Sequence, residues 1–239
     1  MITLHDPELE VLLPVHNEAD SIERVTREIY SEISPRVSMR FIVCEDGSTD
    51  NVQEILARLE NELPMKLIIK KERKGYSRAI RDGMEALSAP YLLCLDSDGQ
   101  YDPADFWNFW KDRDGPDVIL GWRVHRTDVA WRRFFSRTFY FLWRLFYDAP
   151  VHDPSCPFML ARKKVIDEIC PQMGEMDQGF WWEFVARVHR RGLAILEVPI
   201  KHRNRVAGTT RVYKFLKLPI IGYRHVLALF RIRSQTRST

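Results

Sequence analysis

The sequence contains little cysteine, and its few thiols are widely separated. Only four cysteines occur in 239 residues, and no two of them form a CxxC pair. This spacing excludes a zinc site built on cysteine pairs and gives no disulfide framework. Cys44 and Cys94 lie within apolar runs, so we expect reduced, buried thiols and a cytosolic compartment.

Long apolar runs and two nucleotide-binding patterns are also missing. No stretch reaches the ~18 uncharged apolar residues of a membrane-spanning helix. Residues 1–10 hold acids and no apolar run, so we expect no signal peptide. No GxGxxG follows the first predicted strand, and GxxxxGK[ST] does not occur. These absences exclude a dinucleotide-binding Rossmann site and a P-loop.

Acidic residues are absent from the C-terminal part of the chain. From Val198 to Thr239 there are ten lysines or arginines and no aspartate or glutamate, which leaves 26 basic against 33 acidic side chains in the preceding residues. A basic tail on an acidic body predicts binding to a polyanion, either lipid phosphate or nucleic acid.

The remaining composition is that of a globular protein with a large core. Hydrophobic residues make up 45% of the chain and aromatic residues 12%, which excludes disorder. Apolar runs of strand length alternate with stretches of helical spacing, which predicts an α/β fold with a mostly parallel sheet and helices on both faces. The expected strands cover residues 10–15, 40–44, 66–69, 91–95, 117–120 and 194–200.

Polar and acidic turns follow three of these strands, at the sheet edge where open α/β folds bind ligands. The apolar run 91–95 ends at Asp96 and Asp98, and alternate residues of a strand share a face, so both carboxylates are expected to meet one cation. Gln100 adds an amide oxygen, and Mg²⁺ or Mn²⁺ prefers such oxygen ligands. Asp-Ser-Asp-Gly is also a good turn sequence, so this stretch alone leaves a purely structural turn open.

The later part of the chain is rich in aromatic residues and arginine. Residues 131–147 fit either a core helix whose arginines reach solvent or an interfacial helix that touches lipid. In residues 214–233, Pro219 and Gly222 interrupt a mixture of apolar and basic residues, which predicts two short amphipathic helices. Such helices would anchor the chain on anionic lipid.

The three polar turns resemble the N-terminal signatures of family 2 glycosyltransferases. They read Pro14-Val15-His16-Asn17-Glu18, Glu45-Asp46-Gly47-Ser48-Thr49-Asp50 and Asp96-Ser97-Asp98-Gly99-Gln100. The resemblance implies the Rossmann-like GT-A fold, a metal-binding DxD sequence, and transfer of a sugar from a nucleotide-diphosphate donor with inversion at the anomeric carbon.

Other segments resemble the branch of this family that uses polyprenyl phosphates, which includes the dolichol-phosphate mannose synthases. They are Gln100, Arg123 after the fifth strand, and residues 153–160, 198–200 and 205–211. The chain departs from that pattern at three places: Pro157 replaces the usual Gly, Met159 the usual Arg, and Thr210-Arg211 the usual Ser-Lys. Because Met159 removes a cation near the expected acceptor site, a hydroxyl acceptor stays open as an alternative.

The resemblance implies a role for each motif residue. The residues expected to contact the nucleotide sugar, GDP-mannose or a UDP-hexose, are Pro14, His16, Asn17, Glu18, Asp46, Lys74 and Asp96. The residues expected to hold the metal, Mg²⁺ or Mn²⁺, are Asp96, Asp98 and Gln100. The residues expected to be catalytic are Asp98 and Arg123.

The expected acceptor is dolichyl or undecaprenyl phosphate, which is already an anion near neutral pH and needs cations rather than a base. Arginine suits bidentate phosphate contact. The candidate acceptor residues are Arg123, Arg203, Arg205 and Arg211. A hydroxyl acceptor would need a base, for which Glu183 and Asp153 are the candidates.

Residues 1–212 are thus expected to form the catalytic domain and residues 213–239 a basic, amphipathic tail. The tail would hold the protein peripherally on the cytosolic face of an anionic membrane. A nucleic-acid-binding protein would explain the basic tail but not the acidic turns, so we expect no nucleic-acid partner. The sequence leaves the particular sugar and the oligomeric state open.

Overall fold

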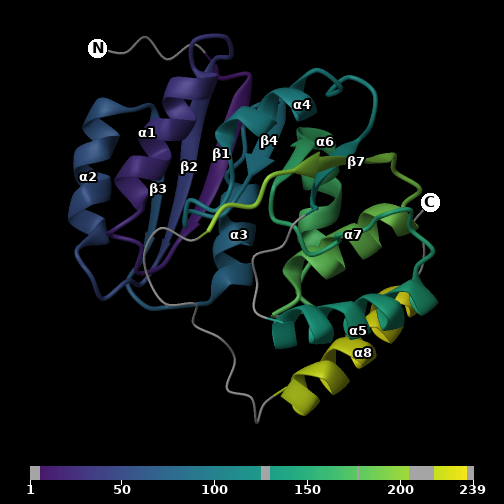
Figure 1. Ribbon diagram of the computed structural model, residues 1–239. Coiled ribbons are helices and arrows are strands. Elements are labelled where there is room, and N and C mark those ends of the chain that lie inside the picture. The colour runs from purple at the N-terminus through teal and green to yellow at the C-terminus, as the bar shows by residue number, and fades with distance from the viewer. Residues whose placement is uncertain (1–5, 125–129, 177, 205–217, 236–239) are drawn as a thin grey trace.

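The computed structural model describes residues 6–124, 130–176, 178–204 and 218–235. Within these ranges, seven strands form one sheet in the order β3-β2-β1-β4-β6-β5-β7 (Figure 1). The strands are β1 (Leu9–Val15), β2 (Met39–Asp46), β3 (Met65–Lys70), β4 (Tyr91–Cys94), β5 (Val118–Arg123), β6 (Met159–Arg162) and β7 (Ile195–Ile200). The predicted α/β fold with a mostly parallel sheet is confirmed.

Strand β6 was not predicted from the sequence, and it determines how the two ends of the sheet meet. It runs antiparallel to β4 on one side and to β5 on the other, whereas the other neighbouring strands pair in parallel. Because β6 is antiparallel to both of its neighbours, β4 and β5 run in the same direction and end at the same edge of the sheet. The turn after β4 and the end of β5 therefore lie on one side of the molecule.

Helices cover both faces of the sheet (Figure 1). They are α1 (Ile22–Ile33), α2 (Val52–Glu62), α3 (Tyr76–Glu85), α4 (Phe106–Trp110), α5 (Ala130–Phe146), α6 (Lys163–Ile169), α7 (Phe180–Arg190) and α8 (Leu218–Ser234), with 3₁₀ turns η1 (Pro103–Asp105) and η2 (Cys170–Gln172). Side chains of α1, α2 and α4 pack on one face, and those of α3 and α5 to α8 on the other.

Alternation along β1 shows how the sheet serves both cores. Leu12 belongs to the core that contains Ile80 of α3, whereas Val11 and Leu13 belong to the core that contains Ile22 of α1. Because successive strand residues point to opposite faces, a sheet buried on both faces needs a continuous apolar run. This is why the central strands read as uninterrupted apolar sequence.

The C-terminal segment forms one helix, which corrects the prediction of two short helices. Pro219 is the second residue of α8, where its missing N–H has no intrahelical partner to lose, and Gly222 lies within the helix. Leu229 is fully buried in the core that contains α7, and Tyr147 donates its hydroxyl hydrogen to the Leu229 carbonyl at 3.0 Å. The described part of the tail is therefore part of the folded core.

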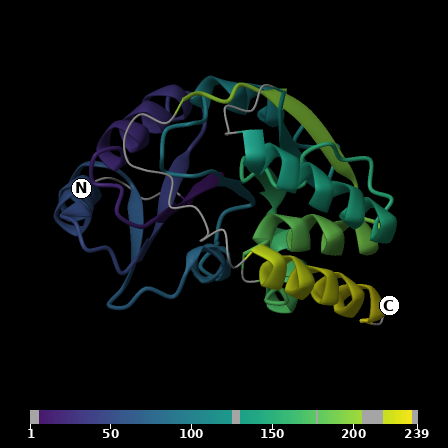
Figure 2. The ribbon, with the colours of Figure 1, turned by 60° about the horizontal axis from the view of Figure 1, so that its bottom comes forward.

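Helices α5, α7 and α8 lie side by side in both ribbon views (Figure 2). In α5, Trp143 is fully buried while Leu145 is 76% exposed, so the helix contributes to the core and its interfacial role stays a prediction. Within the described ranges, no helix combines the length and apolar character needed to cross a membrane. The predicted boundary after residue 212 lies outside the described residues and stays a prediction.

A buried carboxylate ties β1 to β2 and to the segment after α3. Glu10 is fully buried, and it accepts hydrogen bonds from the Arg40 guanidinium and from the backbone N–H of Ser88 (2.5 Å) and Ala89 (3.0 Å). Burial alone would raise the pKa of Glu10, but these donors together lower it below its ordinary value of 4.5. The group is therefore a carboxylate in the folded protein at neutral pH.

We expect Glu10→Gln to lower the free energy of unfolding by about 3 kcal/mol, because it leaves Arg40 beside a neutral amide in a largely buried position. Since the folded-state pKa of Glu10 is lowered, its contribution is complete above pH 4.5 and is lost as the pH falls through the lower folded value. Urea unfolding at pH 7 and at several acidic pH values measures both effects.

The matched control for this prediction is Glu60→Gln, which neutralises an exposed carboxylate of α2. It should change the unfolding free energy by no more than about 0.5 kcal/mol. A difference between wild type and Glu10→Gln that stays constant down to acidic pH would contradict the lowered pKa of Glu10.

Candidate active site

Hydrogen bonds join the turn after β1 to the turn after β2. The backbone N–H of Asn17 donates to the Ser48 hydroxyl at 2.9 Å, and the Asn17 side-chain oxygen accepts the N–H of Thr49 at 2.7 Å. The His16 ring nitrogen Nδ1 lies 3.0 Å from the Asp46 carbonyl oxygen. Asn17 has a φ of 56°, in the left-handed region that asparagine tolerates better than most residues. The two predicted motifs thus form one connected surface.

Asp46 holds the start of α3 against this surface. Its carboxylate accepts the backbone N–H of Lys74 at 2.6 Å and that of Gly75 at 2.8 Å. The side chain is buried, and Gly75 adopts a φ of 97°, a conformation that glycine allows without strain. The described contacts therefore give Asp46 a structural role, and its predicted contact with a nucleotide base stays a prediction.

The acidic pair after β4 lies in a turn rather than in the strand. β4 ends at Cys94, so the strand alternation that placed Asp96 and Asp98 on one face does not apply. Instead the central residue, Ser97, is buried, and its hydroxyl donates to the Pro14 carbonyl at 2.8 Å. Both neighbouring carboxylates are only partly buried, so the turn presents them at the edge of the sheet for a different reason from the one predicted.

Gln100 and Glu18 have identified partners beside this turn. The Asp98 carboxylate accepts the backbone N–H of Gln100 at 3.1 Å, and the Gln100 amide donates to the Arg203 carbonyl at 3.3 Å. Glu18 accepts the hydroxyl of Ser21, the residue that precedes α1, at 2.9 Å. The predicted metal and nucleotide roles of these side chains remain predictions.

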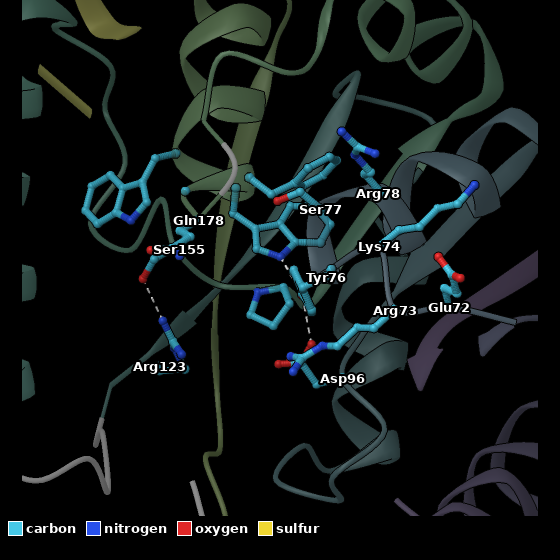
Figure 3. A pocket seen from close by; sticks show the side chains of 16 residues that line it. Glu72, Arg73, Lys74, Tyr76, Ser77, Arg78, Asp96, Arg123, Ser155 and Gln178 are labelled. Atoms are coloured by element: carbon cyan, nitrogen blue, oxygen red, sulfur yellow. Dashed lines mark hydrogen bonds between the residues drawn. The ribbon is translucent and has the colours of Figure 1, made fainter. Parts of the chain in front are cut away.

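A cavity of about 990 Å³ opens beside the acidic turn (Figure 3). Its wall combines the start of α3, the turn after β4, the end of β5 and the start of α7. The basic residues that line it are Arg73, Lys74, Arg78 and Arg123. Lys74, Asp96 and Arg123 were predicted from the sequence, and the structure brings them together around this cavity.

Sequence reasoning missed most of the cavity wall. Arg73 and Arg78 belong to no recognised motif, and the start of α7, which contributes Gln178, Trp181 and Trp182, reads from the sequence as an ordinary core helix. The only signal available was the unusual Trp181-Trp182 pair, which helical periodicity alone assigns to packing.

Tyr76 joins the acidic turn to α7. The Trp181 indole N–H donates to the Tyr76 hydroxyl at 2.9 Å, and that hydroxyl donates to Asp96 Oδ1 at 2.9 Å. Tyr76 as a residue is 39% exposed, and its hydroxyl lies between these two partners. Burial of the hydroxyl, together with the charge of Asp96, raises the pKa of Tyr76 well above its ordinary value. The hydroxyl therefore stays protonated.

Arg123 lies at the end of β5 with its side chain only 10% exposed. It donates to Asp153 from Nε at 2.7 Å and from Nη2 at 2.9 Å, and also from Nη2 to the Ser155 hydroxyl at 2.8 Å. Burial alone would lower the pKa of Arg123, but Tyr101 and Asp153 raise it well above its ordinary value. The guanidinium is therefore charged and held in one orientation.

A second cavity, of about 490 Å³, meets the first at Arg123 and Trp182, which line both. Its aromatic lining includes Trp122, Tyr140 and Phe141. Phe141 is also 58% exposed on the outer face of α5. The second cavity therefore leads from the Arg123 guanidinium toward an apolar outer surface.

Of the other predicted acceptor arginines, the structure describes Arg203, which is paired with carboxylates. Arg203 makes ion pairs with Glu28 at 2.6 Å and with Asp102 at 2.9 Å, and it is not among the described residues that line either cavity. The tail lacks acids in sequence, but acids from other segments reach Arg203 in the fold. Arg205 and Arg211 lie outside the described residues.

Glu183, the candidate base for a hydroxyl acceptor, is held by structural contacts. Glu183 is fully buried, and its carboxylate accepts the backbone N–H groups of Gly174 (3.1 Å), Glu175 (3.2 Å) and Met176 (2.8 Å). Arg187 also donates to it at 2.8 Å. These contacts tie Glu183 to the segment before α7 and favour a structural role for its carboxylate.

Asp153 is equally unsuited to act as a base. Both of its oxygens accept hydrogen bonds from Arg123, and the Ser155 hydroxyl donates to Oδ1 at 2.8 Å. Its own backbone N–H is held by Glu197 at 2.8 Å. Taking a proton would break a buried ion pair, so the geometry favours a structural role for Asp153.

The predicted metal site rests on two carboxylates. No cluster of three or more His, Cys, Asp or Glu side chains suited to a metal occurs among the residues that the structure describes. Asp96 and Asp98 nevertheless provide hard oxygen donors on the two sides of the buried Ser97. That donor set fits a divalent ion that takes its remaining ligands from phosphate and water.

Comparisons with known proteins agree on family and fold. The family model for glycosyl transferase family 2 matches residues 10–170. A dolichyl-phosphate hexose transferase of Haloferax volcanii is 29% identical over 224 residues, covering 90% of this chain and 91% of that protein. An uncharacterized glycosyltransferase of Mycobacterium tuberculosis is 27% identical over 219 residues, with coverages of 89% and 93%.

Two solved structures are similar over nearly the whole chain. Glucosyl-3-phosphoglycerate synthase from Mycobacterium tuberculosis, in complex with Mn²⁺, UDP-glucose and phosphoglyceric acid, gives a TM-score of 0.68 at 18% identity and covers 98% of this chain and 82% of that one. A mannosyltransferase from Pyrobaculum calidifontis, in complex with GDP-mannose and Mn²⁺, gives 0.62 at 15% identity, with coverages of 96% and 74%. At these identities the likeness establishes the fold, and the predicted GT-A fold is confirmed.

We expect Asp153→Ala to lower the free energy of unfolding by about 3 kcal/mol, because it leaves the Arg123 charge buried without its partner. Adding Arg123→Met should recover part of this loss, since the double variant has no buried charge to compensate. Urea unfolding of both single variants and the double variant gives the coupling energy.

Asp148→Ala provides the matched control, because it removes a carboxylate from the exposed pair between Arg144 and Asp148. It should leave the stability essentially unchanged, as exposed ion pairs contribute little. Strictly additive effects of Asp153→Ala and Arg123→Met would show that the two side chains do not stabilise each other.

Proposed function

The chain belongs to glycosyl transferase family 2, and from this premise we propose that it transfers a sugar from a nucleotide-diphosphate sugar to a polyprenyl phosphate. The observation that carries this proposal is the position of Arg123. Arg123 lines both the cavity with basic walls and the cavity with aromatic walls. A polyprenyl phosphate has two matching chemical parts. Its phosphate suits the basic walls, and its hydrocarbon chain suits the aromatic walls.

The larger cavity suits the donor. Arg73, Lys74 and Arg78 supply positive charge along its wall, as binding of a diphosphate requires. Asp96 and Asp98 would hold Mg²⁺ or Mn²⁺, which would supply Lewis-acid stabilisation of the departing diphosphate. The Mn²⁺ complexes of the two similar structures support this assignment, and their UDP-glucose and GDP-mannose support a donor of this class.

The acceptor chemistry agrees with the carboxylates found near the cavities. A phosphate monoester is already an anion near neutral pH, so its oxygen can attack the anomeric carbon without a protein base. The new bond forms between that oxygen and the anomeric carbon as the nucleoside diphosphate leaves with the electron pair of the old bond, which inverts the configuration. Glu183 and Asp153, the two candidate bases, are both fully engaged in structural contacts.

The outer face of α5 supports a peripheral membrane location. Its exposed apolar side chains are Phe135, Phe141, Leu142 and Leu145. Arg137 and Arg144 lie on the same helix, and Tyr223 and Phe230 are exposed on the neighbouring α8. Apolar residues flanked by arginines favour insertion among anionic lipid headgroups. We propose that this combined face of α5 and α8 binds the cytosolic surface of a membrane.

A transfer assay tests the proposed function. Radiolabelled UDP-hexoses and GDP-mannose are offered with a short polyprenyl phosphate, with phosphoglyceric acid or with a simple glycan, each in Mg²⁺ and in Mn²⁺. We expect label to enter the organic phase only with the polyprenyl phosphate. Asp98→Ala should lower this transfer roughly 100- to 1000-fold, as loss of several kcal/mol of metal stabilisation implies.

Two results of this assay would contradict the proposal. Transfer to phosphoglyceric acid or to the glycan, without transfer to the lipid, would identify a different acceptor class. Full activity of a folded Asp98→Ala protein would remove the metal assignment. Melting temperatures of both proteins, measured in parallel, establish that the variant is folded.

We expect Leu145→Glu to weaken binding to anionic vesicles about 10-fold, because it replaces a side chain that would enter the lipid with a charge that the lipid repels. Leu145 is 76% exposed, so the change should not disturb folding. Cosedimentation with phosphatidylserine vesicles measures the binding.

Ile69→Glu is the control for this experiment, since it makes the same change of charge at an exposed apolar residue of β3. It should bind vesicles like the wild type. Deleting α8 would be a poor test, because Leu229 is fully buried and the protein would lose part of its core. Equal vesicle binding by all three proteins would rule out the proposed face.

A further inference from the structure

A chain of hydrogen bonds crosses the wall of the larger cavity and joins three segments that are distant in sequence. Trp181 belongs to α7, Tyr76 is the first residue of α3, and Asp96 lies in the turn after β4. Both contacts measure 2.9 Å. Figure 3 shows the Tyr76 hydroxyl directed at Asp96, on the opposite side of the cavity from Arg123 and Ser155.

The direction of every hydrogen bond in this chain is determined by chemistry. An indole N–H only donates, an ionised carboxylate only accepts, and a phenol has one hydrogen to give. The Tyr76 hydroxyl must therefore accept from Trp181 and donate to Asp96. No other arrangement of protons satisfies both contacts.

This arrangement leaves Asp96 with a restrained carboxylate. The side chain of Asp96 lies in a turn, where no strand neighbour fixes its torsion angles. A hydrogen bond to a charged acceptor is stronger than one between neutral groups, so the Tyr76 hydroxyl holds one oxygen in place. The Trp181 N–H in turn keeps that hydroxyl pointing at Asp96 rather than toward solvent.

We propose that Tyr76 is a positioning residue, which fixes Asp96 in one orientation and couples the acidic turn to Trp181 of α7. The proposal rests on the proposed function for the role of Asp96 as a metal ligand. Partners that orient a metal ligand typically contribute about 10- to 100-fold in metal affinity or activity. Phenylalanine at position 76 would keep the ring and remove only the coupling.

The coupling can be tested without metal or nucleotide. The protein contains seven tryptophans, and labelling with 5-fluorotryptophan gives a ¹⁹F resonance for each, of which that of Trp181 is assigned with Trp181→Phe. We expect Asp96→Asn to shift the Trp181 resonance in the otherwise wild-type protein. In a Tyr76→Phe background the same substitution should leave that resonance unmoved. An equal response in both backgrounds, or none in either, would overturn the proposal.

The consequence for the site is tested with Mn²⁺ as the probe, added with UDP or with GDP. We expect Tyr76→Phe to bind Mn²⁺ about 10-fold more weakly, measured from the electron paramagnetic resonance signal of free Mn²⁺. The control is Tyr91→Phe, which removes a similar hydrogen bond, from Tyr91 to Asp114 at 3.1 Å, at the other end of β4. It should bind Mn²⁺ like the wild type.

The two experiments separate the two proposals. If wild-type protein retains no Mn²⁺ with either nucleotide, the proposed function loses its metal site, whereas the ¹⁹F result still decides whether Tyr76 couples Asp96 to Trp181. If wild type and Tyr76→Phe bind Mn²⁺ equally well, the positioning role is wrong even though the transfer assay succeeds. A fall in kcat at unchanged KM for the acceptor would agree with a lost orientation rather than lost acceptor binding.

Discussion

The buried hydroxyl of Ser97 is the contact on which the carboxyl edge of the sheet depends. It donates to the Pro14 carbonyl at the end of β1, and the Ser97 carbonyl oxygen lies 3.1 Å from the hydroxyl oxygen of Ser21, just before α1. A buried hydroxyl without a partner would be costly, so these bonds fix the turn tightly. With its centre anchored, the turn keeps Asp96 and Asp98 at the surface of the edge. The anchored turn lies beside the other two polar turns and beside the start of α3, which Asp46 holds in place.

In the C-terminal part of the site, the buried groups that need partners are charges rather than hydroxyls. A buried charge needs a partner, because losing its hydration costs several kcal/mol. Arg123 therefore takes Asp153, and Glu183 takes Arg187 together with three backbone N–H groups. The acids that seemed available for proton transfer are the acids that the fold itself needs. This leaves an arginine, rather than a carboxylate, as the charged group at the meeting point of the two cavities.

The sequence predicted the fold class and the place of the site, because parallel strands bring their carboxyl ends to one edge whatever the tertiary details. It did not predict β6, Met159–Arg162, whose place between β4 and β5 depends on pairing with strands distant in sequence. Nor did it predict the partners of Arg203, since Glu28 and Asp102 are distant in sequence. The single helix α8 was missed because Pro219 was read as a break, although a proline in the first turn is compatible with a helix. Strand pairing, ion pairing and helix packing depend on contacts between distant residues, which a local sequence pattern cannot predict.

Under the proposed function, the relative strength of the two parts of the proposed acceptor site favours a lipid over a small phosphate. At Arg123 a phosphate would meet a guanidinium that already shares its charge with Asp153, so the net electrostatic gain there is modest. Each five-carbon isoprene unit placed in the aromatic cavity would gain roughly 3 to 4 kcal/mol, at about 0.8 kcal/mol for each buried CH₂ group. Because the buried Arg123 guanidinium already has Asp153 as its partner, one or two such units would contribute more than the phosphate contact. Binding would therefore come mainly from the hydrocarbon, while Arg123 would determine where the phosphate end stops relative to the donor.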